Sequence, residues 1–186
     1  SDVCSSDLQS LYSTTYGYNN TAIGIYALYG NVSGIYNTAI GSGAGNNVTG
    51  NYNVAIGSET FNNNTGGANR VAVGHQSQYQ SSGNNNVSVG YQSLYSLTTG
   101  TGNVALGYQA GYSNTTGQIT AVGMYALYGN TTGSNNTAVG GYGNAAGAAL
   151  TANTTGSYNS AFGIGALSSN TTASYSTAVG YQEIGR

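Results

Sequence analysis

The residues of this chain that could do acid–base, metal or phosphate chemistry are few and scattered. His75 is the only histidine, and it has no cysteine, aspartate or second histidine to complete a metal site. Glu59 and Glu183 lie far apart, which argues against a carboxylate pair for acid–base chemistry within one chain. No glycine-rich turn is followed by Gly-Lys-Ser/Thr, and no aspartate recurs as in calcium-binding repeat rolls. The sequence therefore predicts a protein that is not an enzyme and carries no cofactor or metal.

Tyrosine is the residue type best suited to contact a ligand, and the chain has 18 of them. Its ring offers a rigid apolar face with a polar hydroxyl, a combination useful at interfaces. One tyrosine recurs at the same position of a repeated unit: Tyr29, Tyr79, Tyr95, Tyr112 and Tyr128. This column is either an adhesive, sugar-stacking strip or an aromatic ladder that stabilises adjacent units.

The element that positions these residues is a short repeat. A triplet of Ala (once Ser), an aliphatic or aromatic residue and Gly returns every 16 or 17 residues, with one longer interval of 23. A short period held over a whole chain is typical of a solenoid, in which one structural unit is stacked many times. The central residues of the triplets are the predicted repeat core: Ile23, Ile40, Ile56, Val73, Val89, Leu106, Val122, Val139, Phe162 and Val179.

A unit of this length has room for about two short strands and two turns, whereas helical solenoid repeats are roughly twice as long. We therefore expect an all-β fold, a parallel β-roll or β-solenoid of about ten coils. Alternation along the strand places Thr21 and Ile23 on one face, with Ala22 and Gly24 on the other. The asparagines that open the units favour an internal hydrogen-bonding ladder. They are Asn20, Asn37, Asn53, Asn86, Asn103, Asn136 and Asn159.

Residues 9–186 form one repeat array, and the long interval predicts a Gly/Ala-rich loop inserted at residues 141–148. Residues 1–8 do not fit the repeat and resemble the translation of a DNA-sequencing library adapter. Our hypothesis is that they are an assembly artefact on a metagenomic gene fragment, to be set aside as a tag would be. Cys4, the only cysteine, falls in this segment, so no disulfide within the chain is possible.

Charged residues make up only 3% of the chain and the formal net charge is −2, which gives no electrostatic basis for binding nucleic acid. No apolar run approaches the length of a membrane span. The coil interior is a thin core for the backbone entropy that folding removes. We expect the rod to gain further stability by association with sister chains, as a homotrimer.

Two stretches resemble the head repeats of trimeric autotransporter adhesins, the YadA-like family, whose units read approximately Asn-Ser-Val-Ala-Ile-Gly. They are residues 53–57 (Asn-Val-Ala-Ile-Gly) and 103–107 (Asn-Val-Ala-Leu-Gly). The resemblance implies a left-handed β-roll, a homotrimer, a cell-surface location and adhesion to a host cell or matrix. The repeats are equally similar to tyrosine-rich arrays in phage and environmental fibre proteins. The period here is longer than the usual adhesin head unit.

The leading expectation is a non-enzymatic, structural and adhesive segment of an extracellular trimeric fibre. It would attach to a host cell, matrix protein or glycan, as part of an outer-membrane-anchored adhesin or a virion fibre. The first alternative is an ice-binding β-solenoid, favoured by low charge and a row of threonines that valines interrupt. The second is an amyloid-like fibre subunit, favoured by the asparagine ladder and the scarcity of charge.

Overall fold

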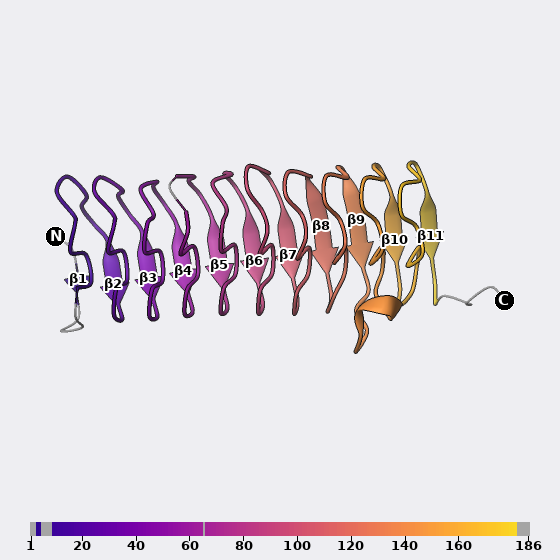
Figure 1. The fold of residues 1–186 in the computed structure, drawn as a ribbon, viewed down its shortest axis with the longest axis horizontal. Helices are drawn as coiled ribbons and strands as arrows, with labels where there is room; N and C mark the ends of the chain where they lie inside the picture. Colours follow the sequence, from indigo (N-terminus) through magenta and orange to yellow (C-terminus); the bar gives the residue numbers. More distant parts are fainter. Residues whose placement is uncertain (1–2, 5–8, 65, 182–186) are drawn as a thin grey trace.

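A computed structural model describes residues 3–4, 9–64 and 66–181, which form a single rod of stacked coils (Figure 1). Each coil contributes one strand to an 11-stranded sheet whose strands lie side by side in chain order. The strands are β1 (Val3–Cys4), β2 (Thr21–Ile23), β3 (Thr38–Ile40), β4 (Val54–Ile56), β5 (Val71–Val73), β6 (Val87–Val89), β7 (Val104–Leu106), β8 (Ile119–Val122), β9 (Asn136–Val139), β10 (Ser160–Phe162) and β11 (Thr177–Val179). The predicted all-β, parallel β-solenoid is confirmed. Glu183 lies outside the described residues.

All neighbouring strands are parallel and pair like residue with like residue. Thr21, Ala22 and Ile23 of β2 lie opposite Thr38, Ala39 and Ile40 of β3, and the same register continues along the sheet. The predicted column of Ile23, Ile40, Ile56 and Val73 is therefore present. At the N-terminal edge, Val3–Cys4 of the segment that does not fit the repeat pairs with Thr21–Ala22.

The glycine that closes each triplet is required for two reasons: the positive φ of the backbone and the close approach of the next coil. Gly24 has a φ of 123°, and a Cβ atom there would lie 2.6 Å from the carbonyl oxygen of Gly41 in the next coil. Tyr26 and Leu28 then adopt left-handed backbone with φ of 60° and 50°. Such conformations are uncommon for residues other than glycine, and here they recur from coil to coil to make a tight corner.

The predicted identity of the core is wrong, although the two faces of the strand were separated correctly. The buried residues are the alanines, such as Ala22 and Ala39 at 0% exposure, whereas Ile23 is 41% exposed. Of the predicted core residues, Ile23, Ile40, Ile56, Val89, Leu106, Val139, Phe162 and Val179 are exposed, and Val73 and Val122 are half-buried. The aliphatic column therefore forms the outer face of the sheet.

The narrowness of the coil explains this arrangement. The interior is filled from the turn opposite the sheet by Leu28, Phe61, Leu94, Leu127 and Leu150, all buried. A Cβ atom at Gly45, on that opposite wall, would lie only 3.6 Å from the Cβ of Ala39. Because the two walls are so close, one row of large side chains fills the space and the facing row must be small.

The asparagine column is an internal ladder, as expected. The amide nitrogen of buried Asn37 donates to the carbonyl oxygen of Gly50 at 2.8 Å, and its Oδ1 accepts from the backbone N–H of Asn53 at 3.0 Å. Equivalent pairs of bonds run from Asn20, Asn86, Asn136 and Asn159. Asn103 accepts from the backbone N–H of Ile119 in the same way, but its amide donates to Oδ1 of Asn86. Each asparagine thus satisfies buried backbone groups at the corner and joins its coil to the next.

Residues 141–148 form a loop that protrudes from the rod after β9 and contains the 3₁₀ turn η1 (Ala145–Gly147) (Figure 1). The backbone N–H of Ala149 donates to the carbonyl oxygen of Gly140 at 3.0 Å, as Ala27 does to Gly24 in a coil without the insertion. The chain therefore re-enters the repeat at the position it left, and the stacking of β9 on β10 is undisturbed.

Candidate binding surfaces

The outer face of the sheet is a broad, uncharged and largely apolar surface. The aliphatic column lies along it, and the position after the closing glycine adds Ile25, Tyr91, Tyr108 and Met124, each 40–45% exposed. No Asp, Glu, Lys or Arg occurs between residues 71 and 182. A contiguous apolar surface of this kind marks an interaction site more often than a free surface.

The predicted tyrosine column is real but interrupted. Tyr79, Tyr95, Tyr112 and Tyr128 form one continuous stack, with ring centroids 5.2–5.3 Å apart and planes within 13° of parallel. Tyr29 lies in a separate stack with Tyr12. These four stacked rings and Tyr29 are half-buried, so the ring faces are occupied by neighbouring rings and the edges meet solvent.

Two further aromatic columns were not predicted. His75, Tyr91 and Tyr108 follow the closing glycines, with successive ring centroids 5.6 and 5.1 Å apart. Burial raises the pKa of Tyr108, and the neighbouring Tyr125 adds to the effect. The other column lies at the corner before the asparagine ladder, where Tyr36 stacks on Tyr52 and Tyr158 on Tyr175. The sequence signal for this column is the residue type that precedes each ladder asparagine.

A line of amide side chains runs along a third edge. Gln76 donates from Nε2 to Oε2 of Glu59 at 2.7 Å, Gln92 donates to Gln76 at 2.8 Å, and Gln109 donates to Gln92 at 2.8 Å. The carboxylate of Glu59 can only accept, so every amide in the line is oriented the same way. The carboxylate is thereby committed to a structural contact.

Arg70 replaces the ladder asparagine in one coil and is completely buried. Its Nε donates to Oδ1 of Asn53 at 2.9 Å, one terminal nitrogen donates to the carbonyl oxygen of Ser81 at 2.7 Å, and its guanidinium lies 4.4 Å from the ring centroid of Phe61. Burial lowers the pKa of Arg70 to about 10. The side chain therefore stays charged at neutral pH, neutralised by no carboxylate among the described residues.

Arg70 belongs to a polar layer that divides the core. Ser77, Gln78 and Ser88 occupy positions that alanine or leucine fill in other coils, and they bond to one another. One apolar cluster extends from Ala22 to Ala72, and the second begins at Leu94. The interior of the rod is therefore two apolar segments joined through one polar coil.

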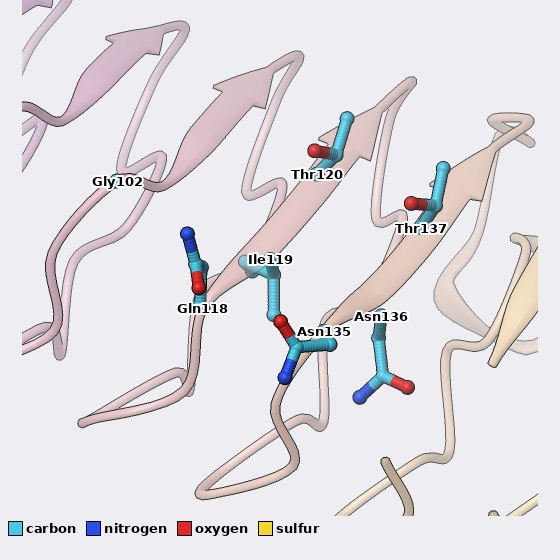
Figure 2. Close-up of a pocket in the computed structure, with 7 residues that line it drawn as sticks. All are labelled: Gly102, Gln118, Ile119, Thr120, Asn135, Asn136 and Thr137. Carbon is cyan, nitrogen blue, oxygen red and sulfur yellow. The ribbon is translucent and has the colours of Figure 1, made fainter. Parts of the chain in front are cut away.

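A shallow, open hollow of about 240 Å³, the notch, lies at the corner column between β7 and β9 (Figure 2). It is lined by Gly102, Gln118, Ile119, Thr120, Asn135, Asn136 and Thr137. Gly102 has no side chain where neighbouring coils carry asparagine or glutamine, and β8 and β9 begin one residue earlier than most strands. The hollow is bordered by the exposed side chains of Gln118 and Asn135 and the half-buried Thr120 and Thr137, whereas Ile119 and Asn136, the first residues of β8 and β9, are buried.

Together these features define a β-solenoid whose distinctive surfaces are an apolar sheet face, tyrosine stacks and one polar notch. Comparison of the chain with protein-family models, with curated proteins and with solved structures finds no match. Within residues 3–4, 9–64 and 66–181, no three His, Cys, Asp or Glu side chains gather where a metal could bind. In the same ranges, no helix has the length and hydropathy to cross a bilayer.

Proposed function

We propose that this chain is a non-enzymatic, structural and adhesive segment of an extracellular fibre assembled from three copies. The observation that supports it is the exposed aliphatic column on the outer sheet face, which each chain alone leaves in water. Burying apolar surface stabilises a protein by about 25 cal/mol per Å². Three sheet faces around a common axis would bury all ten positions of each column.

The choice of three copies rests on the resemblance to YadA-like head repeats, carried by residues 53–57 and 103–107. A rod of stacked coils presents the same side chains many times along its length, which suits attachment through many weak contacts. The fibre would stand on a bacterial cell surface or a virion and attach to a host cell, a matrix protein or a glycan.

Light scattering of the full chain tests the assembly. We expect a mass three times the 18.7 kDa of one chain. Val122→Asp places a charge on the outer face and should give a folded monomer, because the side chain is half-buried in the single chain. Thr132→Asp, in an exposed turn, is the matched control and should remain trimeric. A monomeric wild type at micromolar concentration refutes the proposal, and open-ended filaments would support the amyloid-like alternative.

A second candidate function is ice binding. It is favoured by threonines in register on the flat sheet face, where Thr21 lies opposite Thr38 and Thr120 opposite Thr137. Val54, Val71, Val87 and Val104 separate these pairs, so the threonine row is incomplete. A thermal-hysteresis measurement on the full chain decides: measurable freezing-point depression supports ice binding, and its absence supports the fibre.

A further inference from the structure

Two exposed tyrosine pairs lie on the corner column, each formed by like positions of adjacent coils. The rings of Tyr158 and Tyr175 have centroids 5.1 Å apart and planes 1° from parallel, and those of Tyr36 and Tyr52 have centroids 5.3 Å apart and planes 6° from parallel. All four rings are 48–80% exposed. The strands that follow them, β10 with β11 and β3 with β4, pair in register, so corresponding edges of the two rings in a pair lie side by side.

Two phenol rings held in this way can be joined by oxidation. When each ring loses one electron and its phenolic proton, two phenoxyl radicals form, and their unpaired electrons are shared with the ring carbons beside the oxygen. One such carbon of each ring, a Cε atom, joins the other in a carbon–carbon bond. Each Cε atom then gives up its hydrogen as a proton, and each phenolic oxygen regains one. The pair therefore loses two hydrogen atoms in all, and one molecule of hydrogen peroxide, as the oxidant, takes them up to become two molecules of water.

Proximity and freedom to turn favour the corner pairs over the other tyrosines. Two radicals held in contact within one chain couple far more readily than radicals that must meet by diffusion. Bond formation also requires the rings to turn out of the parallel stack until their Cε atoms meet. The exposed corner rings have room to do so. The continuous stack is half-buried, and its inner rings, Tyr95 and Tyr112, have a neighbouring ring on each face.

The chain contains its own comparisons. Tyr18 lies on the same column and is exposed, but it meets Tyr36 edge to face, with planes at 71° and centroids 6.0 Å apart. Tyr16 and Tyr142 are exposed as well, and neither stacks on another ring within residues 3–4, 9–64 and 66–181. If exposure alone governed oxidation, these three tyrosines would couple as readily as the corner pairs.

We propose that the pairs Tyr158–Tyr175 and Tyr36–Tyr52 are sites of oxidative coupling, where a dityrosine bond joins one coil to the next. The co-reactant is hydrogen peroxide, used by a haem peroxidase. Cys4 is the only cysteine, so no disulfide within the chain can supply such a link. A bond between coils lowers the conformational entropy of the unfolded chain, as a disulfide does, and so stabilises the rod. The inference goes beyond the proposed function and applies to a single chain, whatever the number of copies in the fibre.

The test treats the dilute full chain with hydrogen peroxide and a haem peroxidase. The band that migrates as a single chain in a denaturing gel is digested with thermolysin, and linked peptides are identified by mass spectrometry from the loss of two hydrogen atoms. We expect the two corner links to exceed every other link by about tenfold. The treated chain should also melt at a higher temperature than the untreated chain.

Variants that keep the stack separate coupling from packing. Tyr158→Phe leaves a ring on Tyr175 but has no phenol to oxidise, so it should lose that link and retain the Tyr36–Tyr52 link at the wild-type yield. Tyr175→Phe supplies a second variant with the same expected result. Tyr142→Phe, at an exposed tyrosine without a stacked ring, is the matched control and should leave both links unchanged.

Three results would overturn the inference: links found only in bands of two or more chains, links through Tyr16, Tyr18 or Tyr142 at yields equal to those of the corner pairs, or corner links that leave the melting temperature unchanged. Light scattering of the untreated chain separates this inference from the proposed function. A monomeric wild type that forms both links removes the trimer but leaves the coupling sites, whereas a trimer that forms neither link does the reverse.

Discussion

At the residue scale, Arg70 is the position where the chain departs furthest from its own repeat. A buried cation without a carboxylate is costly, and it is tolerated here because its nitrogens reach Asn53, Ser81 and Gly67. The burial lowers its pKa to about 10, below that of an unfolded arginine. The unfolded chain therefore binds the proton more tightly, and the cost is fully present below pH 10 and relieved only as the pH rises above it.

Replacing Arg70 tests this account. Arg70→Ala should reduce the free energy of unfolding by about 2–4 kcal/mol, because it leaves a cavity over Phe61 and unpaired acceptors on Asn53 and Ser81. Arg70→Asn restores the ladder residue of the other coils and should lose about 1 kcal/mol or less. Denaturant unfolding at pH 7 measures both. Equal losses for the two variants would show that the ladder position carries no specific role.

At the scale of the coil, the sequence predicted the strand, its register and the asparagine ladder, because the repeat displays them many times over. It could not show which face of the strand is buried, because Ala22 and Ile23 are both apolar and alternation separates faces without ranking them. The distance between the sheet and the opposite wall of the coil determines which face of the strand is buried. That distance depends on the leucines opposite the sheet. The sequence did not predict the notch, because it arises at Gly102, where one coil lacks the side chain that its neighbours carry. The prediction used only the positions that the coils share.

The tyrosine stack is also an element-scale feature, and its two interpretations can now be separated. Changing Tyr95, Tyr112 and Tyr128 together to Ser removes three parallel stacks. At about 0.5–1.5 kcal/mol for each aromatic pair, the loss of stability should be about 2–4 kcal/mol. We expect attachment to cells to fall only as far as folding does, measured by circular dichroism melting beside an attachment assay.

The matched control changes the same three tyrosines to Phe, which keeps the stacks and removes the hydroxyl groups. Full stability with full attachment would support a structural ladder. A Phe variant that is stable but no longer attaches would show instead that the exposed ring edges carry adhesion.

At the scale of the whole molecule, the rod is a linear array in which each coil contacts only its neighbours. Removing residues 108–123, one complete coil, would join Gly107 to Met124 and bring Leu94 against Leu127 and Asn103 against Asn136. The melting temperature should fall by less than ~8 °C, because only one coil and one interface are lost. Removing residues 108–115 alone should lower the melting temperature much further, since the remaining half coil is too short to bring β8 beside β7 and the rod is divided there. Similar melting of the two deletion variants would contradict a modular rod.

The hydrogen-bonded line from Glu59 through Gln76, Gln92 and Gln109 affects the electrostatics of the whole rod. Every amide in it donates toward the N-terminal end, as do those of Asn130, Asn153 and Asn170 in the interior. Aligned dipoles add and polarise one another, whereas the alternating bonds between strands largely cancel. The rod, which is almost free of charged residues, therefore has a dipole along its axis. Two rods that meet head to tail would not be equivalent in energy to two rods that meet head to head.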